Sequence, residues 1–219
     1  MTEVFEVDPR KPDVGAVAAA SEALIAGGVV IFPTETVYGI AARPDDPLAT
    51  ERLFAAKDRP RSLNLPVLVS TTVQAWEVST PHPQARRLGA IFWPGPLTMV
   101  LPRTDRSRPW ALGDRGETIG VRVPDHPLTR TLLENVGPVA ATSANPSGQA
   151  PLADRADLVR AFHGRAAVIL ALAPGAAAPA GVPSTVVGWI DGGLEILRSG
   201  GIGEADLQRA AEGEPAQGQ

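Results

Sequence analysis

The sequence predicts a single α/β domain built on a twisted, open, mixed sheet with flanking helices. Apolar runs typical of buried strands interleave with segments of helical spacing, but without the regular strand–helix alternation of a purely parallel sheet. We find no internal repeat and no convincing domain boundary in the 219 residues, a length that can bury a substantial core.

A helix and a buried strand are expected first. Asp13 suits an N-cap and Gly27-Gly28 suit a helix end, which predicts a helix over residues 13–26. Val29 to Phe32 form a continuous apolar run, and Pro33 must end this strand because proline cannot donate to a ladder. The same criteria predict a helix at 48–57, a short strand at 65–69, and helices at 72–78 and 82–93.

The second half of the chain is predicted to add most of the sheet. Strands are expected at 97–101, 118–123, 139–142 and 167–172, with helices at 127–136 and 154–163. Residues 103–116 form a long Arg-rich loop, a length that is often functional or mobile. After a flexible Ala/Pro/Gly connection at 173–183, strands at 184–187 and 194–198 flank the turn Asp191-Gly192-Gly193. We place the domain at residues 10–203, with a short helix and a disordered tail in residues 204–219.

The composition excludes several classes of protein. There is no Cys, which excludes disulfides, thiolate nucleophiles and cysteine-ligated metal. No apolar run approaches the ~20 residues of a membrane span, and the acidic N-terminus does not resemble a signal peptide. We therefore expect a cytoplasmic protein without membrane contact. The net charge of −4 argues against a general nucleic-acid coat, but a local basic cleft stays possible.

Cations and hydroxyls gather at the ends of the predicted elements. They are Lys57 and Arg59 after a helix, Arg122 and Arg198 at strand ends, and Thr34, Thr36, Ser143, Asn145 and Ser184 where strands give way to loops. Lys57 is one of only two lysines among 20 basic residues, which indicates a site that prefers a compact ammonium. Each arginine alone is better explained as a solvated surface charge, but their shared placement favours a site. Cations without a base–nucleophile pair suit phosphate and carboxylate binding.

Other signatures of chemistry are missing. No Gly-rich phosphate loop precedes Lys57, and Gly201-Ile202-Gly203 lacks the third glycine of a dinucleotide fingerprint. His82, His126 and His163 are scattered without metal-ligand spacing, so no protein metal site is predicted.

A series of motifs resembles, in order, those of the YrdC-like threonylcarbamoyl-AMP synthases. They are Pro33-Thr34-Glu35-Thr36-Val37-Tyr38-Gly39, Lys57-Asp58-Arg59-Pro60, Trp93-Pro94-Gly95-Pro96-Leu97-Thr98, Gly120-Val121-Arg122-Val123-Pro124, Thr142-Ser143-Ala144-Asn145-Pro146-Ser147-Gly148, Ser184-Thr185-Val186-Val187 and Ile196-Leu197-Arg198. One such motif is a weak signal, whereas the ordered set is highly specific.

The resemblance implies that L-threonine, bicarbonate and ATP give threonylcarbamoyl-AMP and pyrophosphate. The product would feed a tRNA-modifying transferase complex that acts on the adenosine next to the anticodon. The resemblance also implies a concave, positively charged face. By motif, the threonine-binding residues would be Thr34, Arg122, Ser143 and Ser184. The nucleotide-binding residues would be Lys57, Arg59, Thr118, Asn145 and Arg198, with Lys57 and Arg59 as catalytic residues on the phosphates. Mg²⁺ would arrive with ATP, because the sequence offers no dedicated carboxylate cage.

Three departures from the family pattern stand out. Leu68 replaces a histidine that would help to line the threonine pocket, and Ser199 replaces a proline that often follows the arginine. The chain ends soon after Arg198, so we expect no C-terminal closing domain and assign the role of cover to the loop at 103–116.

Two other interpretations belong to different classes. The first is a non-catalytic module that binds double-stranded RNA on the same concave face, against which the net negative charge counts. The second is a carbamoyl transferase domain of hydrogenase maturation, which the absence of zinc-finger cysteines disfavours.

Overall fold

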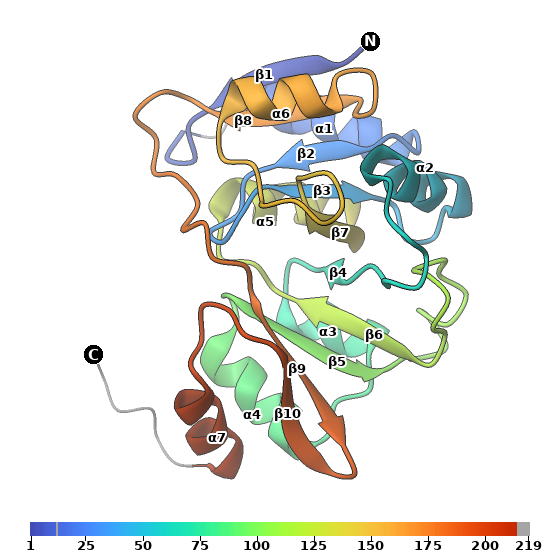
Figure 1. Ribbon diagram of the computed structural model, residues 1–219, viewed down its shortest axis with the longest axis vertical. Helices are drawn as coiled ribbons and strands as arrows, with labels where there is room; N and C mark the ends of the chain where they lie inside the picture. Colours follow the sequence, from blue (N-terminus) through green and yellow to red (C-terminus); the bar gives the residue numbers. More distant parts are fainter. Residues whose placement is uncertain (12, 214–219) are drawn as a thin grey trace.

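The computed structural model describes residues 1–11 and 13–213 and shows one mixed sheet with helices on both faces (Figure 1). Within these residues the sheet has ten strands in the order β1-β8-β2-β3-β7-β4-β6-β5-β9-β10. The sheet contains both parallel pairs, such as β1/β8 and β5/β9, and antiparallel pairs, such as β3/β7 and β5/β6. The predicted open, mixed α/β sheet is therefore confirmed.

The strands are short and follow the chain in a scattered order across the sheet. They are β1 (Glu3–Val7), β2 (Val30–Phe32), β3 (Gly39–Ala42), β4 (Val67–Leu68), β5 (Leu97–Pro102), β6 (Thr118–Arg122), β7 (Val139–Ser143), β8 (Val168–Leu172), β9 (Thr185–Ile190) and β10 (Gly193–Arg198). The helices are α1 (Val14–Ile25), α2 (Pro47–Lys57), α3 (Thr72–Val78), α4 (Pro83–Phe92), α5 (Pro127–Val136), α6 (Arg155–Phe162) and α7 (Glu204–Glu212). None of these helices is long and apolar enough to cross a bilayer.

Helix ends follow local chemistry. The Asp13 carboxylate accepts from the N–H groups of Gly15 and Ala16 and so begins α1, as predicted. Asp46 caps α2 in the same way, and Asp58 ends α2 in the left-handed conformation with φ 52°. Most other boundaries lie within one or two residues of the predicted ones.

Two strands were not predicted. β1 is an edge strand that pairs with β8. β3 follows the Thr34–Tyr38 loop directly and pairs with both β2 and β7. At Gly39, the first residue of β3, a Cβ would lie 3.1 Å from the Phe32 ring, so any larger residue would push against that ring.

The two faces of the sheet carry separate cores. Val30, Phe32 and Ala41 face α1 and α5, whereas Ile31 and Ile40 face the larger core that the remaining helices cover. α7 buries Leu207, Ala210 and Ala211 in that larger core and packs on α4. The sheet is thus sandwiched, except where its central strands open toward a cavity.

The connection at residues 173–183 contains no helix or strand, but it is hydrogen-bonded to the loop that follows β2. The N–H of Ala180 donates to the carbonyl oxygen of Glu35 at 3.0 Å, and the N–H of Gly181 donates to that of Thr36 at 2.8 Å. This segment joins β8, near one end of the sheet, to β9, near the other, and so braces the loop after β2 on the way. The tail predicted to be disordered lies, from residue 214 on, outside the described residues.

Candidate active site

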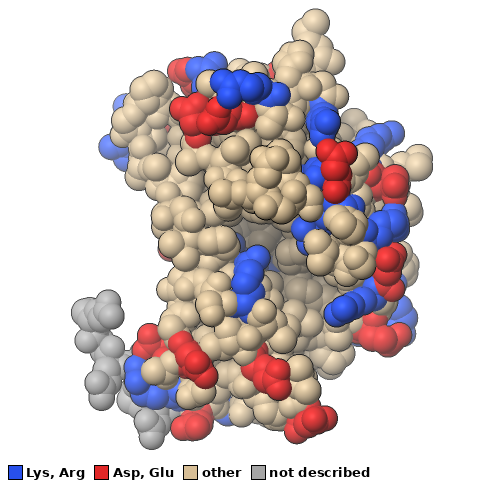
Figure 2. Space-filling model, in the orientation of Figure 1, with Lys and Arg blue, Asp and Glu red and all other residues tan. Residues whose placement is uncertain are grey.

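A cavity of about 460 Å³ opens on one face of the central strands. Figure 2 shows it as a hollow in the middle of the molecule with basic side chains beside it. Four arginines line it, Arg59, Arg115, Arg122 and Arg198, and no Asp or Glu is among the described residues that do so. A protein of net charge −4 thus has a cavity with a local excess of positive charge, as anionic ligands require.

The loop after β2 presents its hydroxyls in a compact turn. The Thr34 hydroxyl donates to the carbonyl oxygen of Val37 at 2.6 Å and accepts from the N–H groups of Thr36 and Val37 at 3.2 and 3.3 Å. It also lies 2.9 Å from the Thr36 hydroxyl. These contacts hold the loop rigidly, and both threonines line the cavity.

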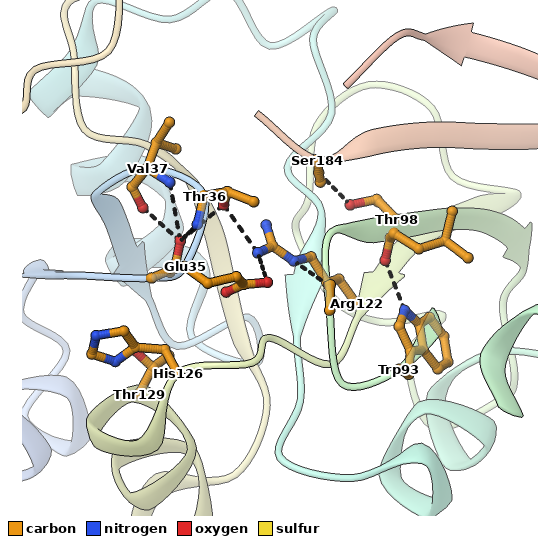
Figure 3. Close-up of polar contacts among 12 residues, drawn as sticks. Glu35, Thr36, Val37, Trp93, Thr98, Arg122, His126, Thr129 and Ser184 are labelled. Atoms are coloured by element: carbon orange, nitrogen blue, oxygen red, sulfur yellow. Dashed lines mark hydrogen bonds and ion pairs between the residues drawn. The ribbon is translucent and has the colours of Figure 1, made fainter. Parts of the chain in front are cut away.

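Arg122 is held from two sides at the end of β6 (Figure 3). Its Nε donates to the carbonyl oxygen of Gly95 at 3.0 Å, and its Nη2 donates to Glu35 Oε1 at 2.6 Å and to the Thr36 hydroxyl at 3.0 Å. Within the described residues, Glu35 Oε2 is buried without a partner. Glu35, whose role the sequence did not indicate, therefore orients Arg122 toward the cavity.

Ser184 and Arg198 form one unit on the β9/β10 side. Arg198 Nη2 donates to the Ser184 carbonyl oxygen at 2.7 Å and to the Ser184 hydroxyl at 3.1 Å. The hydroxyl also lies 2.8 Å from that of Thr98, another residue that the sequence did not indicate. Burial, and secondarily the charge of Arg122, lowers the pKa of Arg198, which stays protonated at any ordinary pH.

Arg59 follows α2 at the other side of the cavity. Its Nε and Nη2 donate to the carbonyl oxygens of Leu63 and Asn64 at 3.0 and 3.1 Å. Burial, with a smaller contribution from Arg198, lowers its pKa. Since guanidinium charges repel at short range, this pair is best balanced by an anion between them.

Lys57 and Asn145 lie behind the cavity wall and do not line it. The Lys57 ammonium donates to the Ser143 carbonyl oxygen and, at 3.5 Å, to Asn145 Oδ1. The Ser147 N–H donates to the Lys57 carbonyl oxygen at 3.0 Å, so the loop after β7 is fastened to the end of α2. Burial, and then the charge of Arg59, lowers the pKa of Lys57 to about 8.

Seven of the nine predicted site residues therefore meet at one cavity, since only Lys57 and Asn145 stand behind its wall. Thr118 lines it at the start of β6, and Leu68 contributes an apolar patch. No group of three metal-ligating side chains occurs in residues 1–11 and 13–213.

The loop at 103–116 is ordered by Arg103 and forms one rim of the cavity. Arg103 is buried and donates through Nε to the Thr118 carbonyl oxygen at 3.1 Å and through Nη1 to that of Trp110 at 2.9 Å. Arg115, at the end of this loop, lines the cavity and was not predicted as a site residue. An Arg-rich loop gives no indication of which arginine faces a ligand.

Known proteins share this architecture. A family model for Sua5, YciO and YrdC proteins, described as telomere recombination, matches residues 22–200. The chain belongs to the Sua5/YciO/YrdC family. A Mycobacterium tuberculosis protein is 38% identical over 215 residues, which cover 97% of this chain and 95% of that protein. A Marinobacter nauticus protein named threonylcarbamoyl-AMP synthase is 32% identical over 187 residues, 84% of this chain and 97% of its own length.

A solved structure supplies a bound substrate for comparison. Pyrococcus abyssi Sua5, crystallised in complex with L-threonine, superposes with a TM-score of 0.82 at 29% identity and matches 96% of this chain. The matched region is 60% of the Sua5 chain. The similarity thus covers the sheet and the cavity described above.

Proposed function

We propose that this protein is a threonylcarbamoyl-AMP synthase, which joins L-threonine, bicarbonate and ATP. The observation that carries the proposal is the cavity, whose described lining residues include four arginines and no carboxylate, with the Thr34 turn at one wall. That lining suits two anionic partners that must be brought together. The names of full-length relatives and the threonine complex of Sua5 support the same assignment.

The reaction requires alignment more than covalent catalysis. The amine of threonine adds to bicarbonate with loss of water and gives a carbamate. A carbamate oxygen then forms a bond to the α-phosphorus of ATP, and the bond to the β-phosphate oxygen breaks, releasing pyrophosphate. Both reactants are negatively charged, so the cavity arginines neutralise their repulsion while rigid loops fix the line of attack.

We assign the two ends of the cavity to the two substrates. Arg122, steered by Glu35, takes the threonine carboxylate, and the hydroxyls of Thr34, Ser143 and Ser184 complete this pocket. The nucleotide lies toward Arg59, Thr118 and Arg198. Lys57 and Asn145 act from behind Ser143, and Lys57 reaches a phosphate only when its ammonium leaves the Ser143 carbonyl oxygen.

Magnesium would be carried by ATP itself. The described residues that line the cavity offer no carboxylate for it, so the phosphates and water would supply its ligands. When bound, the ion neutralises charge on the departing pyrophosphate.

The product is a mixed anhydride that an amine can attack, which suits transfer to tRNA adenosine by a separate transferase complex in the cytoplasm. An RNA-binding module is the weaker alternative, because four arginines meet in a cavity whose volume of about 460 Å³ suits a small ligand.

Pyrophosphate release from ATP tests the proposal. Release should require both L-threonine and bicarbonate and should not require RNA. Release that is independent of threonine, or absent with all three substrates and Mg²⁺, would contradict it.

A further inference from the structure

Arg115 is the cavity arginine whose guanidinium has no partner among the described residues. The other three donate to protein acceptors: Arg59 to two carbonyl oxygens, Arg198 to Ser184, and Arg122 to Gly95, Glu35 and Thr36. In the described part of the chain, the Arg115 guanidinium makes neither a hydrogen bond nor an ion pair, although its backbone makes two hydrogen bonds. An exposed, unpaired cation at the rim of a cavity is available to a ligand.

The position of Arg115 is fixed by Asn64. Asn64 Nδ2 donates to the Arg115 carbonyl oxygen at 2.6 Å, and its Oδ1 accepts from the Arg115 N–H at 3.2 Å. One side chain thus satisfies both backbone groups of Arg115, as a neighbouring strand would. Gly113, with φ 132°, allows this approach, since a Cβ there would lie 2.5 Å from Asn64 Oδ1.

The same asparagine links Arg115 to Arg59. Its carbonyl oxygen accepts from Arg59 Nη2 at 3.1 Å, so the two arginines flank one residue on one wall of the cavity. Arg122 is at the other end, because Thr118 and Arg122 are four positions apart on β6, about 13 Å along the strand. A threonine bound at Arg122 is shorter than this span, so Arg115 is better placed to meet the other substrate, ATP.

On the basis of the proposed function, we propose that Arg115 binds the β- and γ-phosphates of ATP and then the pyrophosphate formed from them. Asn64 is the positioning residue that holds it there. An arginine contributed by the loop at 103–116 would make this loop part of the nucleotide site.

Nucleotide binding by calorimetry tests the role without turnover. Arg115→Ala should weaken Mg-ATP binding roughly five-fold, a modest loss because the contact is solvent-exposed, and should change AMP binding little. Arg115→Lys should recover part of the loss, because the ammonium keeps the charge. The matched control is Arg108→Ala in the same loop: Arg108 pairs with Asp105 and does not line the cavity, so ATP affinity should stay at the wild-type value.

Asn64 is tested by a double-mutant cycle. Asn64→Ala should weaken ATP binding, and adding Arg115→Ala should then cost less than it does in the wild type, since the arginine is no longer held. If Asn64→Ala fails to fold, the comparison of Arg115→Ala with Arg108→Ala still decides the role of Arg115.

The proposal is overturned if Arg115→Ala leaves ATP affinity unchanged, weakens AMP equally, or raises the Michaelis constant for threonine instead. These outcomes apply when the wild-type protein itself releases pyrophosphate in the presence of threonine and bicarbonate. A wild type that binds ATP but lacks that activity refutes the proposed function, and the ATP-against-AMP comparison still decides whether Arg115 is a phosphate contact.

Discussion

Nucleotide affinity should depend on pH through a single buried amine. Lys57 is 2% exposed, and burial beside Arg59 brings its pKa down to about 8. Guanidinium groups in general keep their charge throughout this range. Burial also lowers the pKa of His82 and His126, so both are neutral above pH 7.5. Lys57 is therefore the described cavity-side group expected to lose its charge between pH 7.5 and 9.5.

The size of the effect follows from the fraction of ammonium. With a pKa of 8, about three quarters of Lys57 is protonated at pH 7.5 and about 3% at pH 9.5. A bound phosphate raises the pKa of the amine and recovers part of the charge. A charge-assisted contact contributes about 1.5–3 kcal/mol, so we expect ATP to bind roughly ten-fold more weakly at pH 9.5 than at pH 7.5.

Calorimetric ATP binding at fixed Mg²⁺ over this pH range is the assay, with Lys57→Met as the control. This variant keeps every other titrating group, so its residual pH dependence can be subtracted. It also leaves the Ser143 carbonyl oxygen and Asn145 Oδ1 without their donor, so a thermal melt must first show that it is folded. A wild-type affinity that falls no more steeply with pH than that of Lys57→Met would refute the role of the ammonium.

Three further predictions follow from the same geometry. Arg122→Lys should raise the Michaelis constant for threonine roughly ten-fold and that for ATP much less, because a lysine cannot hold the carboxylate, Glu35 and Gly95 together. A lowered melting temperature with an unchanged Michaelis constant for threonine would show that Arg122 stabilises the fold and does not bind threonine. Serine should react more slowly than threonine, by the roughly ten-fold that one methyl contributes, and valine should react far more slowly; equal rates with valine would exclude a pocket that binds the hydroxyl. Arg103→Met should lower the melting temperature by about 4–8 °C, because the partly buried carbonyl oxygens of Thr118 and Trp110 lose their donor. An unchanged melt would show that the loop at 103–116 orders without it.

The fold was predictable where local chemistry is explicit. Asp13 caps its helix, and Pro33 ends β2, as the sequence indicates. β3 could not be found from its own residues, because Gly39-Ile40-Ala41-Ala42 has the small residues that strands disfavour. It becomes a strand through its two neighbours, β2 and β7, and that pairing is set by the whole sheet.

The site was predictable as a set of motifs but not as a geometry. Motif order located the residues that meet at the cavity, yet gave no sign that Lys57 stands behind Ser143. Arg115 escaped prediction because its placement depends on Asn64, 51 residues earlier in the chain. Contacts between distant loops leave no periodic signal in a single sequence.

Identification of the product tests the central claim most directly. The purified protein is incubated with L-threonine, Mg-ATP and ¹³C-bicarbonate. The products are then separated, and their masses are measured by mass spectrometry. We predict an adenylate that carries threonine and one ¹³C atom, formed together with pyrophosphate and lost when threonine or bicarbonate is omitted. Formation of unlabelled threonyl-AMP, or of no adenylate by a protein that binds ATP, would contradict the assignment.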